Sequence, residues 1–389
     1  MRLSRTLAAV CPQRFFDTCQ TEGIKFFSGV PDSLLKEFCA VVSSRSKSHV
    51  IAANEGSAVS LAAGHYLATG SVPLVYAQNS GFGNMVNPLL SLAHPKVYGI
   101  PMVLLLGWRG EPGVKDEPQH EVMGSRMQSG LDGFGIEWLE LNSVSDEAAG
   151  ESLQKAIDLA KQTSSPVALL VRKNAFASSD VVHKDTIDKP ERMSREEVTR
   201  LTCAVLSNAL FVASTGLLSR ELYEIREHLY NGDHSRDFLC VGSMGHAGSI
   251  AAGIATESGE CTVVCLEGDG ALLMHMGSMA IIGGSLKPKN LVHICINNGL
   301  HESVGGQPTV GFQTDFCAIA KACGYSHVFK VTEGASLRKT LERCSSALEG
   351  PVFIEVRVKP GFRTNIGRPK TTPIQNKLSF MSSFANIDK

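Results

Sequence analysis

The sequence lacks several features that would point to particular classes of protein. Its formal net charge is -1 over 389 residues, so the charge balance gives no reason to expect nucleic acid or a membrane as the main partner. No apolar run reaches the roughly 18 to 20 residues that a membrane-spanning helix needs. What remains is an ordinary soluble globular composition, 43% apolar, with a length that suggests about two to three domains.

The cysteines lack the spacing of a disulfide or zinc framework. All 11 are scattered through apolar runs without a Cys-x-x-Cys pair, so we expect buried thiols in a reducing compartment. A nicotinamide-binding fingerprint is missing as well. The glycine-rich turns at 81–83 and 242–248 do not fit Gly-x-Gly-x-x-Gly, and no acid lies suitably downstream.

The N-terminus contains no acid before Asp17. Such a basic, hydroxyl-bearing, acid-free stretch resembles a mitochondrial transit peptide, and the alternative is a plain first helix in a cytoplasmic protein. We therefore treat 1–14 as a possible extension and leave two localisations open, mitochondrial or cytoplasmic. The residues that carry this pattern are Arg2, Ser4, Arg5, Thr6 and Arg14.

Short apolar runs alternate with helical segments along most of the chain. This alternation predicts an α/β fold with two doubly wound parallel sheets, each covered by helices on both faces. A polar, charged segment at 181–197 is the expected linker between domains at 15–180 and 198–389. The expected strands lie at 25–27, 49–52, 72–77, 102–107, 167–171, 210–213, 238–241, 262–266, 291–296 and 352–358.

One stretch of the second domain carries the most specific chemistry. Gly268-Asp269-Gly270 follows a buried strand and opens an expected helix at 271–282, and Asn297-Asn298 ends the next strand. Since the carboxyl ends of parallel strands meet at one edge of a sheet, Asp269 and Asn298 can converge. Their oxygens, with a backbone carbonyl, suit Mg²⁺, and the helix N-terminus suits a phosphate. The alternative is a glycine turn and an Asx-rich loop in an ordinary doubly wound domain.

Gly-Asp-Gly, 26 intervening residues and Asn-Asn together resemble the diphosphate-binding motif of thiamine-diphosphate enzymes. Three further stretches, 26–33, 107–120 and 297–309, are similar to those of the 2-oxo-acid decarboxylases in this family that act on 3-phosphonopyruvate, with 3-sulfopyruvate decarboxylases as near relatives. The resemblance runs from Gln13 to the C-terminal region. It implies a pyrimidine-binding domain followed by a diphosphate-binding domain, without a central domain between them.

The resemblance also implies how thiamine diphosphate and Mg²⁺ would be bound. Glu55, at the end of an expected strand, would exchange a proton with N1′ of the aminopyrimidine. Gly242 would accept from the 4′-amine through its carbonyl, and Met244 would wedge between the two rings. Asp269, Asn298 and the carbonyl of Leu300 would hold Mg²⁺. The remaining cofactor-binding candidates are Ser243, Gly268, Gly270 and Ala271.

The activity implied is decarboxylation of 3-phosphonopyruvate to phosphonoacetaldehyde and CO₂, in 2-aminoethylphosphonate biosynthesis. Asp32, His120 and His301 join Glu55 as catalytic candidates, and the substrate candidates are Arg109, Lys115, Asn79 and Ser80. For Lys115 the alternative is a surface ion pair with its acidic neighbours. The resemblance further implies a homodimer or higher homo-oligomer with active sites at the subunit interface. A sulfopyruvate decarboxylase and an inactive cofactor-binding subunit or scaffold are the competing interpretations.

Overall fold

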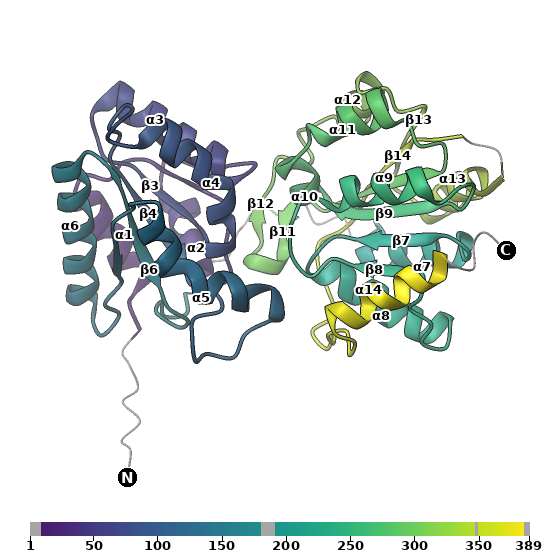
Figure 1. The fold of residues 1–389 in the computed structure, drawn as a ribbon, viewed down its shortest axis with the longest axis horizontal. Helices are drawn as coiled ribbons and strands as arrows, with labels where there is room; N and C mark the ends of the chain where they lie inside the picture. Colours follow the sequence, from purple (N-terminus) through teal and green to yellow (C-terminus); the bar gives the residue numbers. More distant parts are fainter. Residues whose placement is uncertain (1–8, 180–190, 347–348, 385–389) are drawn as a thin grey trace, which may run out of the picture. The chain divides into compact units, whose positions relative to one another are not determined.

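The computed structural model describes residues 9–179, 191–346 and 349–384. The chain divides into two compact units (Figure 1). The N-terminal unit comprises Met1–Lys184 with Val304–Gln307, and the C-terminal unit comprises Asp185–Ser303 with Pro308–Lys389.

The N-terminal unit is built on a six-stranded sheet with the order β2-β1-β3-β4-β6-β5, and its strands pair in parallel. Alternate residues of its central strands point to opposite faces, so each face has its own apolar core. One core is covered by α1, α2 and α6, and the other by α3, α4 and α5. The elements are α1 (Pro12–Thr21), β1 (Phe27–Gly29), α2 (Lys36–Arg45), β2 (His49–Ile51), α3 (Glu55–Thr69), β3 (Leu74–Gln78), η1 (Asn79–Gly81), α4 (Phe82–Pro88), η2 (Leu89–Ala93), β4 (Met102–Gly107), α5 (Pro118–Gly133), β5 (Trp138–Glu140), α6 (Asp146–Thr163) and β6 (Pro166–Val171).

The C-terminal unit repeats this plan with a second six-stranded parallel sheet, β13-β14-β10-β9-β7-β8. Helices α7, α8 and α13 cover one face, and α9, α12 and α14 cover the other. The elements are α7 (Arg195–Val205), β7 (Leu210–Ala213), α8 (Leu217–Leu229), β8 (Asp237–Leu239), α9 (Ala247–Glu257), β9 (Val263–Gly268), α10 (Asp269–Met274), α11 (Ser278–Ile281), η3 (Ile282–Leu286), β10 (Leu291–Asn297), β11 (Leu300–His301), η4 (Glu302–Val304), β12 (Gln307–Pro308), α12 (Phe316–Ala322), β13 (His327–Val331), α13 (Gly334–Ser346), β14 (Val352–Arg357) and α14 (Pro373–Phe384).

The predicted fold class is confirmed, and each expected strand has a counterpart within a few residues. The two-residue strands β11 and β12 were not predicted, nor were two strands of the six-stranded sheets, β5 and β13. Both β5 and β13 lie at the edge of a sheet and are only partly buried, so they lack the continuous apolar run of a central strand.

The continuous helix expected at 271–282 is wrong. Helix α10 ends at Met274, His275 leaves the helical backbone region at φ -133° and ψ 41°, and a second short helix, α11, begins at Ser278. Gly277 lies in the interruption, where its low helix propensity favours a break.

The two predicted boundary segments lie partly outside the described residues. Within the expected extension 1–14, helix α1 already begins at Pro12, and the next turn buries Phe15 and Phe16 in the core of the N-terminal unit. The expected linker 181–197 is described only from residue 191 onward. Its last residues form the start of α7, where Ser194 and Glu197 make a reciprocal capping box.

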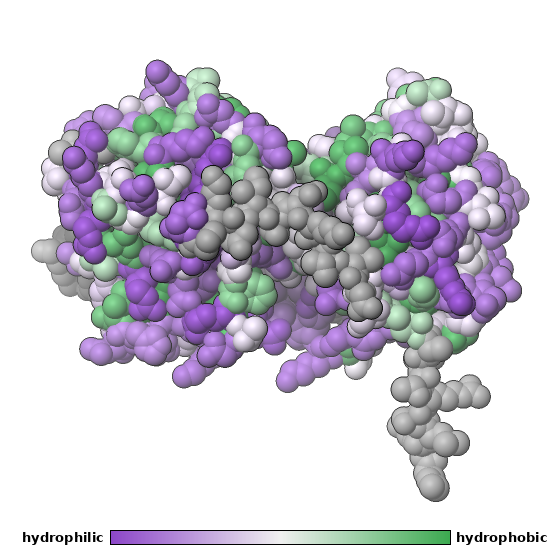
Figure 2. Space-filling model, turned by 180° about the vertical axis from the view of Figure 1, so that it is seen from behind, coloured by the Kyte–Doolittle hydropathy of each residue, from purple (hydrophilic) through white to green (hydrophobic). Residues whose placement is uncertain are grey.

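In the part of the chain that the structure describes, no helix is long and apolar enough to cross a membrane. On the face seen in Figure 2, hydrophilic residues cover most of the surface, and hydrophobic residues gather in separate patches.

Candidate active site

Glu55 is the first residue of α3, directly after the turn that follows β2. The side chain of Asn54 caps this helix, because the Ser57 backbone N–H donates to Asn54 Oδ1 at 2.8 Å. The carboxyl of Glu55 is buried, which raises its pKa, and the hydrogen bond from Asn84 Nδ2 to Oε2, 2.7 Å long, opposes that rise. Gly81 lies against the other oxygen, so closely that a Cβ at position 81 would collide with Glu55. Glu55 is thus a buried carboxyl in a fixed orientation, able to hold or release a proton.

Asp32 is a second buried carboxyl of the N-terminal unit, in the loop after β1. Its Oδ2 accepts from the Leu34 backbone N–H at 3.0 Å, whereas its buried Oδ1 has no hydrogen-bond partner. Gly107, the last residue of β4, provides the space for this carboxyl, because a Cβ there would overlap Oδ2. Burial raises the pKa of Asp32 to about 6, and the nearby Arg109 guanidinium acts in the opposite direction.

The loop 109–120 is organised by Asp116, a residue that the sequence analysis did not single out. Arg109 donates through Nε at 2.7 Å and through a second nitrogen to the two oxygens of Asp116, and through its third nitrogen to Ser33 Oγ at 2.8 Å. His120 Nδ1 lies 3.0 Å from Asp116 Oδ1. Although burial acts in the opposite direction, the hydrogen bonds from Arg109 and His120 hold the pKa of Asp116 well below its usual range. Burial lowers the pKa of His120. The loop therefore presents an arginine and a histidine that one carboxylate holds in place.

Two of the other substrate candidates occupy different environments. The Asn79 amide is buried and bonded to the main chain of Arg109, donating to its carbonyl at 2.8 Å and accepting from its N–H at 3.1 Å. Asn79 therefore ties the end of β3 to the end of β4. The exposed Ser80 accepts from Gln78 Nε2 at 2.6 Å.

Lys115 is exposed, and its acidic neighbour Asp116 is engaged by Arg109 and His120. No ion pair joins Lys115 to Asp116 among the described residues, whereas a pair with Glu117, the other acidic neighbour that the sequence suggested, stays a prediction.

In the C-terminal unit, Asp269 begins α10 at the end of β9. Its carboxyl is fully buried and accepts from the Thr309 hydroxyl. Burial raises its pKa to about 6, while Thr309 and the backbone N–H groups of Asn298 and Gly299 oppose that rise. These contacts bring Asp269 together with the end of β10, 28 residues further along the chain. Gly311 leaves no room for a side chain between Asp269 and Asn297.

The segment after β10 is held by the two consecutive asparagines. Asn297 is buried and donates to the Gly311 carbonyl at 2.8 Å and to Glu355 Oε1 at 3.0 Å, while its own oxygen accepts from the Gly299 N–H at 3.1 Å. Asn298 Oδ1 accepts from the Leu300 N–H at 3.0 Å. This leaves a lone pair on Asn298 Oδ1, the carboxylate of Asp269 and the Leu300 carbonyl as oxygen donors, the chemistry that Mg²⁺ prefers.

His301 follows in β11, next to the start of α10. Its ring lies against Gly270, where a Cβ would come within 2.7 Å of its Cε1 atom. Burial lowers the pKa of His301 to about 4, so the imidazole is neutral at neutral pH. A glycine at position 270 is therefore what allows the histidine to approach the helix N-terminus.

The turn 242–248 between β8 and α9 contains the remaining cofactor candidates. Ser243 is exposed and takes a left-handed conformation at φ 53°, and Gly245 does so at φ 85°. A Cβ at Gly245 would come within 2.8 Å of His275 Cδ2. Met244 is half-buried, and its role as a wedge between the cofactor rings stays a prediction.

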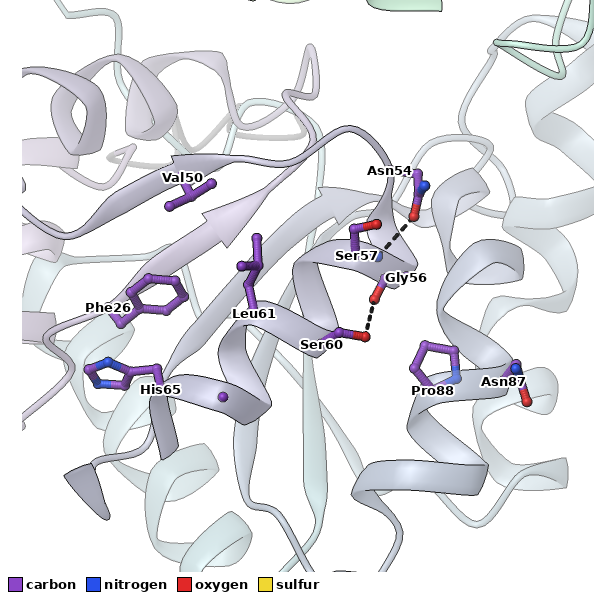
Figure 3. A pocket seen from close by; sticks show the side chains of 11 residues that line it. Phe26, Val50, Asn54, Gly56, Ser57, Ser60, Leu61, His65, Asn87 and Pro88 are labelled. Carbon is purple, nitrogen blue, oxygen red and sulfur yellow. Dashed lines mark hydrogen bonds between the residues drawn. The ribbon is translucent and has the colours of Figure 1, made fainter. Parts of the chain in front are cut away.

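Beside α3 lies an open groove of about 880 Å³. Figure 3 shows Ser57, Ser60, Leu61 and His65 of α3 along it, with Phe26 and Val50 on one side and Asn87 and Pro88 on the other. Leu61 and Val50 are 43% and 38% exposed, respectively. Glu55 does not line this groove, although its neighbours Asn54 and Gly56 do.

Each of the two units matches a known domain family. Residues 12–130 match the N-terminal TPP binding domain of thiamine pyrophosphate enzymes, and residues 222–356 match the C-terminal TPP binding domain. These matches and the two strand-end carboxyls place the chain in the class of thiamine-diphosphate enzymes.

The match extends over nearly the whole length of individual relatives. The chain is 34% identical to "Phosphonopyruvate decarboxylase" of Streptomyces viridochromogenes, over 91% of this chain and 89% of the relative. It is 35% identical to the protein of the same name from Streptomyces hygroscopicus, over 90% and 88%. "Sulfopyruvate decarboxylase" of Methanosarcina acetivorans is 28% identical over 90% of this chain and 91% of the relative. The chain belongs to the phosphonopyruvate decarboxylase family.

These relatives overturn one expectation. The mitochondrial localisation drawn from the basic N-terminus is wrong, because the relatives that match over nine-tenths of the chain come from Streptomyces, bacteria that have no mitochondria. Composition misled here because three arginines and an absence of acids also occur at the start of ordinary chains. Most of that stretch lies outside the described residues.

Proposed function

We propose that this protein decarboxylates 3-phosphonopyruvate to phosphonoacetaldehyde and CO₂, using thiamine diphosphate and Mg²⁺. One observation supports the proposal above all. The chain is 34 to 35% identical to two phosphonopyruvate decarboxylases, and each of its two cofactor-binding domains has a buried carboxyl after a strand, Glu55 in the first and Asp269 in the second. The aldehyde product would supply 2-aminoethylphosphonate synthesis.

The C-terminal unit supplies an oxygen donor set for the metal. Asp269 is a buried carboxyl whose hydrogen-bond partners are all neutral, so a cation beside it would favour its ionised form. Asn298 and the Leu300 carbonyl would complete the protein's share, with the diphosphate providing further oxygens. The N-terminus of α10 and the glycines at 268 and 270 would receive that diphosphate on backbone N–H groups.

Bound thiamine diphosphate would supply a carbon nucleophile and a sink for the electrons released with CO₂. Glu55 would pass a proton between its carboxyl and the N1′ atom of the aminopyrimidine. Its raised pKa makes the protonated form accessible, and Asn84 together with Gly81 fixes the direction in which the carboxyl points.

The substrate is a multiply charged anion, and the loop 109–120 offers cationic groups for it. Each of the three nitrogens of the Arg109 guanidinium already donates a hydrogen bond to Asp116 or Ser33, so we assign Arg109 to holding this loop in shape. Lys115 is exposed, and Asp116 beside it pairs with Arg109 and His120; we propose that Lys115 contacts the phosphonate or the carboxylate of the substrate. His120, held by Asp116, is a candidate donor beside it.

Two groups are candidates for the proton that the decarboxylated product must gain. Asp32 has a raised pKa and a free buried oxygen, so it can carry a proton near pH 6. His301 is neutral and half-buried, so it can accept or donate a hydrogen bond without carrying charge.

We further propose that the enzyme acts as a homodimer or higher homo-oligomer, in which one subunit's pyrimidine-binding domain completes the site of another. The open, partly apolar groove along α3 supports this proposal, because Leu61 and Val50 are apolar side chains left exposed beside it. A Leu61→Glu variant should sediment as a smaller species than the wild type and lose activity in parallel. The exposed Leu378→Glu variant, in α14, is the matched control.

The decisive experiment measures CO₂ release from 3-phosphonopyruvate by the purified protein, with and without thiamine diphosphate and Mg²⁺. Turnover that requires both additions is expected. Competition between phosphonopyruvate and sulfopyruvate then decides the substrate, and a preference for sulfopyruvate would replace the proposed activity by that of the more distant relative. Cofactor binding without turnover of either acid would favour the scaffold interpretation.

A further inference from the structure

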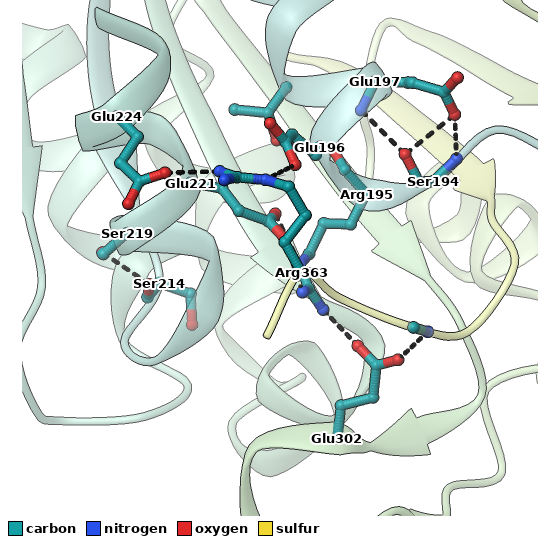
Figure 4. A network of polar contacts seen from close by, with 12 residues as sticks. Ser194, Arg195, Glu196, Glu197, Ser214, Ser219, Glu221, Glu224, Glu302 and Arg363 are labelled. Atoms are coloured by element: carbon teal, nitrogen blue, oxygen red, sulfur yellow. Dashed lines mark hydrogen bonds and ion pairs between the residues drawn. The ribbon is translucent and has the colours of Figure 1, made fainter. Parts of the chain in front are cut away.

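The segment 300–303 contains the Leu300 carbonyl and the His301 ring. The side chain that attaches this segment to the rest of the C-terminal unit is that of Glu302, one residue after His301. Glu302 directs its carboxylate into a network of charged side chains (Figure 4). Its Oε2 accepts from an Arg195 guanidinium nitrogen at 2.5 Å, and its Oε1 accepts from the backbone N–H of Gly361. Both oxygens of Glu302 are therefore engaged, and its side chain is only 9% exposed.

Arg195 is itself held rigidly. It is the first residue of α7, where the Ser194 and Glu197 capping box fixes the start of the helix. Two of its nitrogens donate to the two oxygens of Glu221 in α8, each at 2.8 Å. Since Arg195 and Glu221 are both buried, this bidentate pair has a single geometry, and the third guanidinium nitrogen is left to bind Glu302.

A neighbouring pair in the same network provides a contrast. Arg363 donates to Glu196 at 2.6 Å and also to Glu224, but its side chain is 40% exposed. Exposed pairs of this kind contribute little to stability because water and salt compete for both partners. Among the described residues, the side-chain hydrogen bonds of Arg363 go to Glu196, Asn365 and Glu224, and none goes to Glu302.

We propose that Arg195 is a positioning residue for the cofactor site: through Glu302 it sets the placement of the Leu300 carbonyl and the His301 ring. This inference rests on the proposed function for the identity of the cofactor. The physical reason is that a carbonyl can serve Mg²⁺ only where its backbone is held, and Glu302 is the nearest side chain in sequence that anchors this backbone to two helices. Partners that hold metal ligands in place typically change metal affinity by about 10- to 100-fold when they are removed.

The test compares Glu302→Gln, Arg195→Lys and the control Arg363→Ala by calorimetric titration of thiamine diphosphate in the presence of Mg²⁺. In Glu302→Gln the amide nitrogen cannot accept from Gly361, and a neutral oxygen binds Arg195 more weakly. We expect the Kd for thiamine diphosphate to rise by about 10-fold or more. Arg195→Lys keeps the charge but cannot reach Glu221 and Glu302 together, so an intermediate rise is expected. Arg363→Ala should stay within about twofold of the wild type.

A second readout uses the protein without cofactor. Hydrogen exchange at the Leu300 amide, which donates to Asn298, should become faster in Glu302→Gln and stay unchanged in Arg363→Ala. Saturating cofactor should restore most of the lost turnover, which a general folding defect would not permit. An unchanged Kd and unchanged exchange in Glu302→Gln, or an equal loss of affinity in Arg363→Ala, would overturn the proposal. If the wild type binds thiamine diphosphate but does not release CO₂ from phosphonopyruvate, the proposed function fails, and the assignment of Arg195 is still decided by binding.

Discussion

Each unit presents a buried carboxyl at the first residue of a helix that follows a parallel strand, and the two units surround it in different ways. Glu55 begins α3 after β2, and Asp269 begins α10 after β9; burial raises the pKa of both. Glu55 accepts a hydrogen bond from one side-chain amide, whereas Asp269 accepts from a hydroxyl and lies beside backbone N–H groups and further oxygen donors. The first environment suits a group that exchanges a proton, and the second suits a group that binds a cation. A strand-to-helix turn thus supports two kinds of chemistry, one after the edge strand β2 and one after the interior strand β9, and the neighbouring residues decide between them.

The largest effect should come from removing the proton of Glu55. Glu55→Gln keeps the size and the hydrogen-bonding capacity of the side chain but cannot pass a proton to a ring nitrogen. We expect turnover of phosphonopyruvate to fall by about 10²- to 10⁴-fold, the usual contribution of general acid–base catalysis, with cofactor affinity nearly unchanged. CO₂ release and calorimetric titration measure the two quantities. Glu147→Gln, at an exposed position in α6, is the control, and wild-type turnover by Glu55→Gln would remove Glu55 from the mechanism.

At Asp269 we expect the opposite of Glu55: a substitution should reduce cofactor affinity. Asp269→Ala should weaken the binding of Mg²⁺ and of thiamine diphosphate together, by more than about 100-fold, because a lost ligand should cost at least as much as a lost supporting residue. Titration of the cofactor at several Mg²⁺ concentrations measures both affinities. If turnover fell while both affinities stayed unchanged, Asp269 would have the same role as Glu55, and the proposed difference between the two carboxyls would be wrong.

A smaller effect should follow from changing the neighbour of Asp269 instead of the carboxyl itself. Thr309→Val keeps the shape of the side chain and removes the hydroxyl that donates to Asp269. The Mg²⁺ affinity should fall by about 10- to 100-fold. Thr314→Val, at an exposed threonine of the same unit, should have no such effect. Equal affinities in all three proteins would show that the hydroxyl does not orient the carboxyl.

The smallest effect concerns Asp32. In the described structure its buried carboxyl has neither a side-chain amide as a partner, as Glu55 has, nor a hydroxyl, as Asp269 has. Because its folded pKa of about 6 lies above the ordinary value of 3.8, the folded protein binds more protons in this window, and stability is lost as the pH rises from about 4 to about 6. Asp32→Asn should remove this pH dependence and be more stable than the wild type at pH 7 by up to ~3 kcal/mol, since one pKa unit corresponds to ~1.4 kcal/mol. Urea unfolding at pH 4.5 and pH 7 measures the difference, with the exposed Asp158→Asn as control. Parallel pH dependence in wild type and Asp32→Asn would contradict the raised pKa.

The sequence was informative wherever burial imposes a pattern. Central strands such as β4 and β10 are buried throughout and mostly apolar because helices cover both of their faces, and this made the fold class predictable. Asp269 could be identified because an acid directly after such a run lies at the ligand-binding edge of the sheet, whereas Glu55 follows the partly exposed strand β2 and was singled out through the family resemblance.

The supporting residues could not be found in the same way. Asn84 lies 29 residues from Glu55, and Thr309 lies 40 residues from Asp269. Each is a common polar residue far from its acid in the sequence, so only the folded chain reveals its partner. Asp116 was overlooked for a related reason: beside Lys115 and Glu117 it looked like part of a solvated charged surface, yet it holds Arg109 and His120.

Gly81 has a consequence for how the sequence can vary. It carries no functional group, yet its backbone lies so close to the Glu55 carboxyl that any Cβ would displace the acid. In a saturation scan scored by growth on the enzyme's product, position 81 should therefore tolerate as few replacements as position 55 itself. Its neighbour Ser80, whose side chain is exposed, should accept many.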